Sequence, residues 1–240
     1  MSYVSKIAAG WAAFVGTHMI MSHPGNREAI IDKLGGEQPF LGAYSLVALG
    51  TFLPTTYYYN KYLRDVRKGL IKPQIAFTPS KFTKGLGVFL TGAYFFIAPQ
   101  VMSSPSPSAQ NGNKSEAQDV RGLLRVTRHP LFASLGVLGI GRCLSLGTVP
   151  ALVYWGGMPL FFLIGTWHQD YRQRSVFSQR YFENTSQVPF VAIAQGKQKL
   201  GDVYNELNPN MLFIGALLVC AFLVMRGNRA RNLLASKNIL

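Results

Sequence analysis

Residues 125–147, with the sequence RVTRHPLFASLGVLGIGRCLSLG, contain a basic cluster, a proline and then a long apolar run. Pro130 suits the first turn of a helix, because the N–H that proline lacks would have no helical partner there. The residues 131–146 are mostly apolar, and Gly147 separates them from a further apolar run. An apolar helix that starts directly behind cations is typical of a segment that enters a membrane from its interface.

Arg142 lies in the second half of this apolar run. An arginine at the middle of a membrane costs about 2.5–3.5 kcal/mol even on the most lenient insertion scale, so a partner, a lipid phosphate or water must offset it. Alternatively, the stretch 139–142 ends a short helix and places the side chain at the interface. The polar residues at 145 and 148 favour this second interpretation.

The composition of the whole chain also indicates a membrane protein. Of its 240 residues, 48% are hydrophobic and 14% are charged, yet the net charge is +14. Soluble domains usually contain about 25% charged residues. The cations flank the apolar runs and do not interrupt them, which argues against a soluble nucleic-acid-binding protein, so no nucleic-acid partner is expected. The two cysteines predict neither a zinc site nor a disulfide.

Six apolar runs are candidate membrane spans. They cover residues 7–22, 40–59, 85–102, 131–146, 148–167 and 211–225. Several are short against the roughly 20 residues that a span needs, so five to six spans are expected. Glycines are frequent in these runs, and small residues allow helices to approach closely inside a membrane. We therefore predict an all-α, polytopic transmembrane helix bundle.

Two further predictions concern the second half of the chain. The aromatic and basic segment 169–193 is expected to form an amphipathic helix along the membrane interface before the last span. The chain is divided into a membrane domain over 1–205 and an additional C-terminal helix with a basic tail over 206–240. Because the first apolar run starts so near residue 1, any import signal is expected to be internal.

Two histidines are candidate ligands. His18 lies inside the first apolar run, and polar residues at membrane depth usually face the interior of the bundle. Its imidazole can bind a metal or haem iron, or it can form a hydrogen bond between helices. His129 lies between Arg128 and Pro130. An arginine at this position can extend its side chain to the membrane interface, but this does not explain the presence of the histidine.

Several arginines are candidate binding sites for lipid headgroups or other anions. They are Arg125, Arg128, Arg142, Arg172 and Arg174. Arginines at the level of the headgroups can hold a phosphate or a carboxylate. Asp170 is expected to pair with an arginine from another helix. The sequence contains no Ser/His/Asp arrangement and no phosphate-binding loop, so no catalytic residue is assigned.

Three stretches together resemble the NnrU family of integral membrane proteins, which includes the zeta-carotene isomerases. They are GWAAFVGTHMIMS at the start, DVRGLLRVTRHPLFASLGVLGIG in the middle and NTSQVPFVAIAQGKQ towards the end. The resemblance covers roughly residues 10–200, and within it His18 and Tyr44 fit the family pattern. Membrane methyltransferases also carry an Arg-His-Pro motif, but the rest of their pattern fits this chain only in part.

The resemblance implies a cofactor and a substrate class. For the isomerases it implies haem b held by histidines and a polyene substrate in the lipid phase, with His18 and His129 as the matching histidines. This chain departs from the family at Arg142, where members commonly have a histidine. That substitution removes one candidate ligand, and no metal other than haem iron is expected.

Three functions follow as hypotheses. We expect first a non-catalytic accessory subunit of an energy-transducing membrane complex, of respiratory or ATP synthase type. Its partners would be other membrane subunits and anionic lipids such as cardiolipin, and the mitochondrial inner membrane is the preferred location, ahead of a plastid or bacterial inner membrane. The alternative is a haem b-dependent cis–trans isomerase of a carotenoid-like polyene, and the third is a membrane methyltransferase.

Overall fold

The computed structural model describes residues 1–103, 120–175 and 177–237, and for 229–237 only the backbone. Within these residues the chain is helical and contains no strand, apart from one isolated bridge between Ile75 and Thr148. The long helices are α1 (Tyr3–Ser22), α2 (Pro24–Leu34), α3 (Glu37–Arg67), α4 (Lys81–Ser103), α5 (Pro130–Leu146), α6 (Val149–Gln173) and α10 (Pro209–Lys237). The predicted all-α bundle is confirmed.

Three of these helices are long and apolar enough to cross a membrane. They are α4, α6 and the part of α10 from Pro209 to Asn228, while α5 is a shorter apolar helix. Many large apolar side chains on the outside of the bundle are exposed, which is the pattern of a surface that faces lipid. The chain is therefore an integral membrane protein, and the count of five to six spans stays a prediction.

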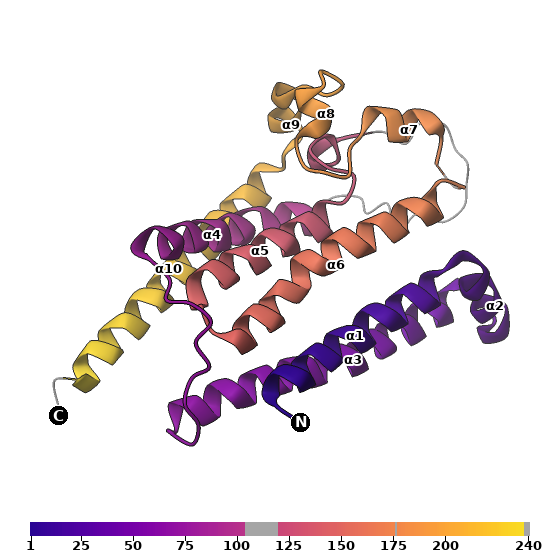
Figure 1. Cartoon of the computed structure of the whole chain (residues 1–240). Coiled ribbons are helices and arrows are strands. Elements are labelled where there is room, and N and C mark those ends of the chain that lie inside the picture. The colour runs from indigo at the N-terminus through magenta and orange to yellow at the C-terminus, as the bar shows by residue number, and fades with distance from the viewer. Residues whose placement is uncertain (104–119, 176, 238–240) are drawn as a thin grey trace.

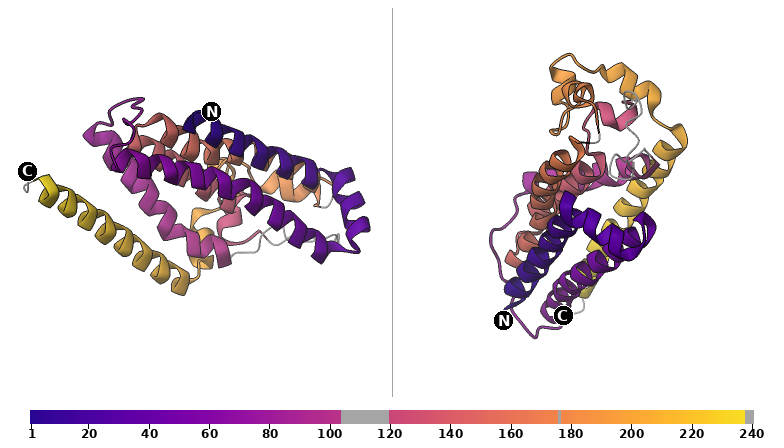
Figure 2. Two further views of the ribbon diagram at one scale, coloured as in Figure 1. Left: turned by 90° about the horizontal axis from the view of Figure 1, so that it is seen from below. Right: turned by 90° about the vertical axis from the view of Figure 1, so that its right-hand side faces the viewer.

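The helices form two groups that meet at α6. Helices α4, α5 and α6 lie side by side, α10 packs against α4, and the pair α1 and α3 packs against α6 (Figure 1). Figure 2 shows the same grouping from two further directions. Buried residues of α1, α3 and α6 form the hydrophobic core between the groups: Ile7, Trp11, Tyr59, Ala151 and Tyr154.

Local sequence explains where several helices begin and end. Helix α1 begins after Ser2, whose hydroxyl accepts a hydrogen bond from the backbone N–H of Ser5. Helix α2 begins at Pro24, and only His23 separates it from the end of α1. Helix α5 begins at Pro130 and ends before Gly147, which adopts a left-handed conformation with φ 64°. This left-handed conformation disfavours any residue other than glycine at position 147. A side chain would also clash sterically, since a Cβ would lie 2.3 Å from the carbonyl oxygen of Phe77.

The segment after α6 differs from the prediction. In place of one amphipathic helix over 169–193, the structure has the end of α6, then α7 (Gln179–Asn184) and α8 (Val191–Ala194). The intervening backbone forms hydrogen bonds with the segment that precedes α5: Arg128 N–H donates to Ser186 O at 2.9 Å, and Phe190 N–H donates to Val126 O at 2.8 Å. These partners lie far away in sequence and stop the helix from continuing.

The short helices gather at one end of the bundle. Helices α7, α8 and α9 (Leu200–Glu206) lie together at the top of Figure 1, where α9 also contacts a short 3₁₀ helix at Gly122–Arg125. The proposed division into 1–205 and 206–240 stays a prediction, and the last three residues of that tail lie outside the described part of the chain.

Candidate functional site

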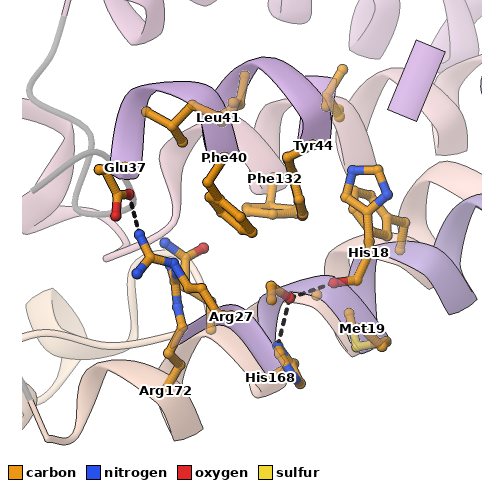
Figure 3. A pocket seen from close by; sticks show the side chains of 16 residues that line it. His18, Met19, Arg27, Glu37, Phe40, Leu41, Tyr44, Phe132, His168 and Arg172 are labelled. Atoms are coloured by element: carbon orange, nitrogen blue, oxygen red, sulfur yellow. Dashed lines mark hydrogen bonds and ion pairs between the residues drawn. The ribbon is translucent and has the colours of Figure 1, made fainter. Parts of the chain in front are cut away.

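A cavity of about 420 Å³ lies between α1, the α2–α3 corner, α5 and α6. Its volume is within the range of pockets that bind small molecules. Its walls are mostly apolar, with aromatic side chains from three helices, and Figure 3 shows how its side chains face one another. Its polar side chains are His18, Ser22, Arg27, Glu37, Tyr44, His168, Gln169 and Arg172.

His18 holds its ring by a hydrogen bond to its own helix. Its Nδ1 lies 2.8 Å from the carbonyl oxygen of Phe14. A carbonyl oxygen only accepts, so Nδ1 carries the proton and the other ring nitrogen, Nε2, keeps a lone pair. The ring is packed between Phe14, Tyr44 and Phe161, with centroid distances of 4.0, 4.9 and 5.4 Å. A fixed neutral imidazole of this tautomer is the form in which histidine binds metals.

His168 reaches the same cavity from α6 and has the same tautomer. Its Nδ1 lies 3.4 Å from the hydroxyl oxygen of Ser22, and that hydroxyl donates its single proton to the carbonyl oxygen of His18. Ser22 therefore accepts from Nδ1–H of His168, and the lone pair is on Nε2. This Nε2 is buried without a hydrogen-bond partner among the described residues. A buried nitrogen of this kind is a position at which a water or a ligand can bind.

The far side of the cavity is positively charged. Arg27 from α2 pairs with Glu37 from α3, and its guanidinium also lies 5.1 Å from the ring centre of Phe40. Figure 3 shows Arg172 beside Arg27, and both lie across the cavity from His18. Two cations face one carboxylate here, so this side of the cavity suits an anionic group.

The structure does not bring His129 together with His18. His129 is buried at the start of α5, with Nε2 2.7 Å from Asp170 Oδ1, and it does not line the cavity. Arg128 lies 3.7 Å from the other oxygen of Asp170. Asp170 was predicted to pair with an arginine from another helix; it does pair with an arginine, but Arg128 lies in the segment before α5 and not in a helix. This buried group joins the start of α5 to the end of α6.

Arg125 belongs to a separate cluster of charges at the short helices. It donates to both carboxylate oxygens of Glu206, at 2.6 and 2.8 Å, and to Gln198 at 2.7 Å. The backbone N–H of Gly122 donates to the same carboxylate at 2.6 Å. These bonds, chiefly those from Arg125, hold the pKa of Glu206 at about 2. The cluster ties α9 to the segment before α5.

The remaining predicted arginines lie in three different places. Arg142 stands one turn before the end of α5 at Leu146, and its guanidinium lies 5.1 Å from the ring centre of Trp155. Arg174 is exposed at the end of α6. Of the five arginines predicted to bind anions, Arg172 lines the cavity.

Sequence analysis missed three residues of the cavity, Arg27, Glu37 and His168. One signal was available for the last of them, because Gly165, His168 and Arg172 are spaced three and four residues apart and therefore share one face of a helix. The described residues contain no group of three or more His, Cys, Asp or Glu side chains that could hold a metal ion. A cofactor that brings its own ligands to a metal needs only one or two histidines.

Comparisons with known proteins identify the family. The family model described as "NnrU protein" matches residues 6–229, so the chain belongs to the NnrU family. The chain is similar to the 15-cis-zeta-carotene isomerase, chloroplastic, of Arabidopsis thaliana, with 28% identity over 200 residues that cover 80% of this chain and 52% of the relative. For the Zea mays protein of the same description, identity is 27% over 117 residues, 48% of this chain and 32% of the relative.

The chain therefore spans about half the length of the Arabidopsis relative, 52%, and about a third of the Zea mays relative, 32%. No solved structure matches the chain.

Proposed function

Since the chain belongs to the NnrU family, we propose that it is a haem-dependent cis–trans isomerase of a polyene in the membrane. The similarity to two zeta-carotene isomerases supports this activity over that of an accessory subunit or a methyltransferase. The observation that carries the proposal is the cavity lined by both His18 and His168, each with its Nδ1 in a hydrogen bond.

The residues of the cavity fit haem b. His18 is the first ligand, because its ring is fixed by Phe14 and its Nε2 is available for iron. His168 is the second, because its buried Nε2 has no partner in the described part of the chain. His168 takes the place of His129 in this role, because His129 does not line the cavity.

The two arginines across the cavity fit the acidic groups of haem. Haem b has two propionate side chains, and Arg27 and Arg172 are placed to pair with them. Glu37 holds the guanidinium of Arg27 in position.

Bound haem supplies a redox-active iron that lowers the barrier to rotation about a double bond. The protein provides the geometry for this chemistry. His18 from α1 and His168 from α6 would hold the cofactor, and the aromatic walls of the cavity would shield it from water. Since the reaction only exchanges cis for trans, no side chain has to transfer a proton.

The absorption spectrum of the purified protein tests the proposal. After expression with ample haem precursor, the protein in mild detergent should show a Soret band, and His18→Ala should lose most of it. His129→Ala is the matched control, because His129 does not line the cavity. A colourless wild-type protein, or a Soret band of equal strength in His18→Ala, contradicts the proposal.

The second ligand has its own test. His168→Ala should still bind haem through His18 but change from a low-spin to a high-spin spectrum, and added imidazole should restore the low-spin form. An unchanged spectrum would show that His168 does not bind the iron.

The location follows the same reasoning. Both relatives are described as chloroplastic, which favours a plastid membrane over the mitochondrial inner membrane. Anionic lipids, cardiolipin included, and neighbouring membrane subunits stay predicted partners. Purification in a mild detergent tests the hypothesis of an accessory subunit. If the protein migrates alone, that hypothesis loses its main support.

A further inference from the structure

A second hollow, here called the apolar groove, adjoins the cavity. Its volume is about 310 Å³, and all nine residues that line it are apolar. Five of them are aromatic: Trp11, Phe14, Phe52, Phe132 and Phe161. A pocket that binds a polar ligand usually contains a few polar groups that fix its orientation. The lining of the apolar groove contains none, so the groove suits a hydrocarbon.

The polar atom of Trp11 is directed elsewhere. Its indole N–H donates to the carbonyl oxygen of Tyr154 at 2.9 Å. The ring lies directly on Gly157, where a Cβ would come within 2.0 Å of the indole carbons. Trp11 is therefore held in place by α6 and presents only its carbon surface to the apolar groove.

The apolar groove continues into the cavity that contains His18. Phe132, Leu135 and Phe161 line both. Phe14 and Phe161 line the groove and also contact the ring of His18, at centroid distances of 4.0 and 5.4 Å. A molecule in the groove consequently lies one aromatic ring away from His18.

The outer wall of the groove faces the lipid. Leu49 lines the groove and is 51% exposed, and its neighbours on α3, Leu46 and Leu53, are exposed as well. A hydrocarbon dissolved in the membrane can therefore enter sideways past α3 without crossing water.

We infer that the apolar groove binds the conjugated segment of a polyene beside the cofactor cavity. This inference rests on the proposed function, which places haem in that cavity. The aromatic walls select a flat conjugated chain over a saturated one, because flat π-systems stack favourably on aromatic rings. The volume suits a segment of a long polyene, and the remainder extends past α3 into the lipid.

Induced circular dichroism of an achiral polyene tests the inference. Diphenylhexatriene, a flat and apolar polyene, shows no dichroism in a detergent micelle and should gain a band in the wild-type protein. Ala48→Phe fills the groove and should abolish the band while the Soret band stays. Ala12→Phe is the matched control, since Ala12 is exposed on α1 and lines neither hollow.

Leu49→Trp is the second filling variant in case Ala48→Phe does not fold. A wild-type protein without the band, or a band that persists in a folded filling variant, overturns the inference. Displacement of the polyene by a saturated hydrocarbon of equal length at equal concentration also overturns it, because the groove would then be indifferent to conjugation.

The two proposals fail separately. If the protein shows a Soret band but no polyene band, the inference about the groove fails and the proposed haem site stands. If the protein shows the polyene band but no Soret band, the proposed haem site fails and the polyene-binding groove stands. The variant His18→Ala should show this second pattern.

Discussion

Replacing Gly87 with alanine is expected to weaken the contact between α4 and α5. At Gly87 an added Cβ would lie 2.4 Å from the carbonyl oxygen of Gly141, and a Cβ at Gly141 would lie 2.8 Å from the carbonyl oxygen of Gly87. Ordinary van der Waals contact begins at 3.4 Å, so the helices would have to separate by about 1 Å, the difference between 3.4 and 2.4 Å. The hydroxyl of Ser145, at 2.3 Å from this Cβ, can rotate away, but the carbonyl oxygen of Gly141 belongs to the backbone and cannot.

The magnitude follows from two opposing effects. Overpacking a close contact costs about 1–3 kcal/mol. Alanine also stabilises a helix over glycine by up to about 1 kcal/mol. Gly85→Ala is the matched control, because Gly85 is on the same helix and an added Cβ there meets nothing within 4 Å. The helix gain is common to both variants, so their free energies of unfolding should differ by about 1–3 kcal/mol.

Unfolding with increasing SDS in mixed micelles, followed by circular dichroism, measures this difference. Gly85→Ala should be as stable as the wild type or more stable, and Gly87→Ala should unfold at a lower SDS fraction. A Gly87→Ala protein as stable as Gly85→Ala would refute the reasoning, because α4 and α5 would then not approach as closely as the structure shows.

Two further predictions concern the charged clusters. Glu206 has a pKa held at about 2 by Arg125, against about 4.5 when unfolded, so its ionised form stabilises the fold above pH 4.5 and this contribution is lost as the pH falls towards 2. Glu206→Gln should flatten the dependence of the unfolding midpoint on pH in this window, and an unchanged slope would contradict the assignment. His129→Ala removes the closer of the two partners of the half-buried Asp170 and leaves Arg128, so it should cost about 1–3 kcal/mol while the haem spectrum stays unchanged. A folded His129→Ala protein that lost its Soret band would instead make His129 a ligand.

Features that depend on neighbouring residues were predicted well. The run predicted over 131–146 is α5 at Pro130–Leu146, because proline and glycine act on the backbone directly beside them. The predicted amphipathic helix over 169–193 failed for the opposite reason. Its carbonyl and N–H groups bind residues 126–128, which periodicity within the segment cannot reveal.

The candidate site was predicted only in part. His18 was identifiable because a histidine within an apolar run is unusual by itself. The pairing of His129 with Asp170, and the presence of His18 and His168 in one cavity, bring together residues separated by long stretches of chain. Sequence spacing cannot distinguish these two arrangements.

The sequence by itself determined that this protein is a basic, helical membrane protein of the NnrU type, because apolar runs, prolines and glycines act locally. Only the tertiary structure decided which histidine faces the cavity and which is used in an ion pair. That choice depends on the order in which α1, α3, α5 and α6 pack around one another. The packing in turn depends on close contacts such as Trp11 on Gly157, which join residues far apart in the chain.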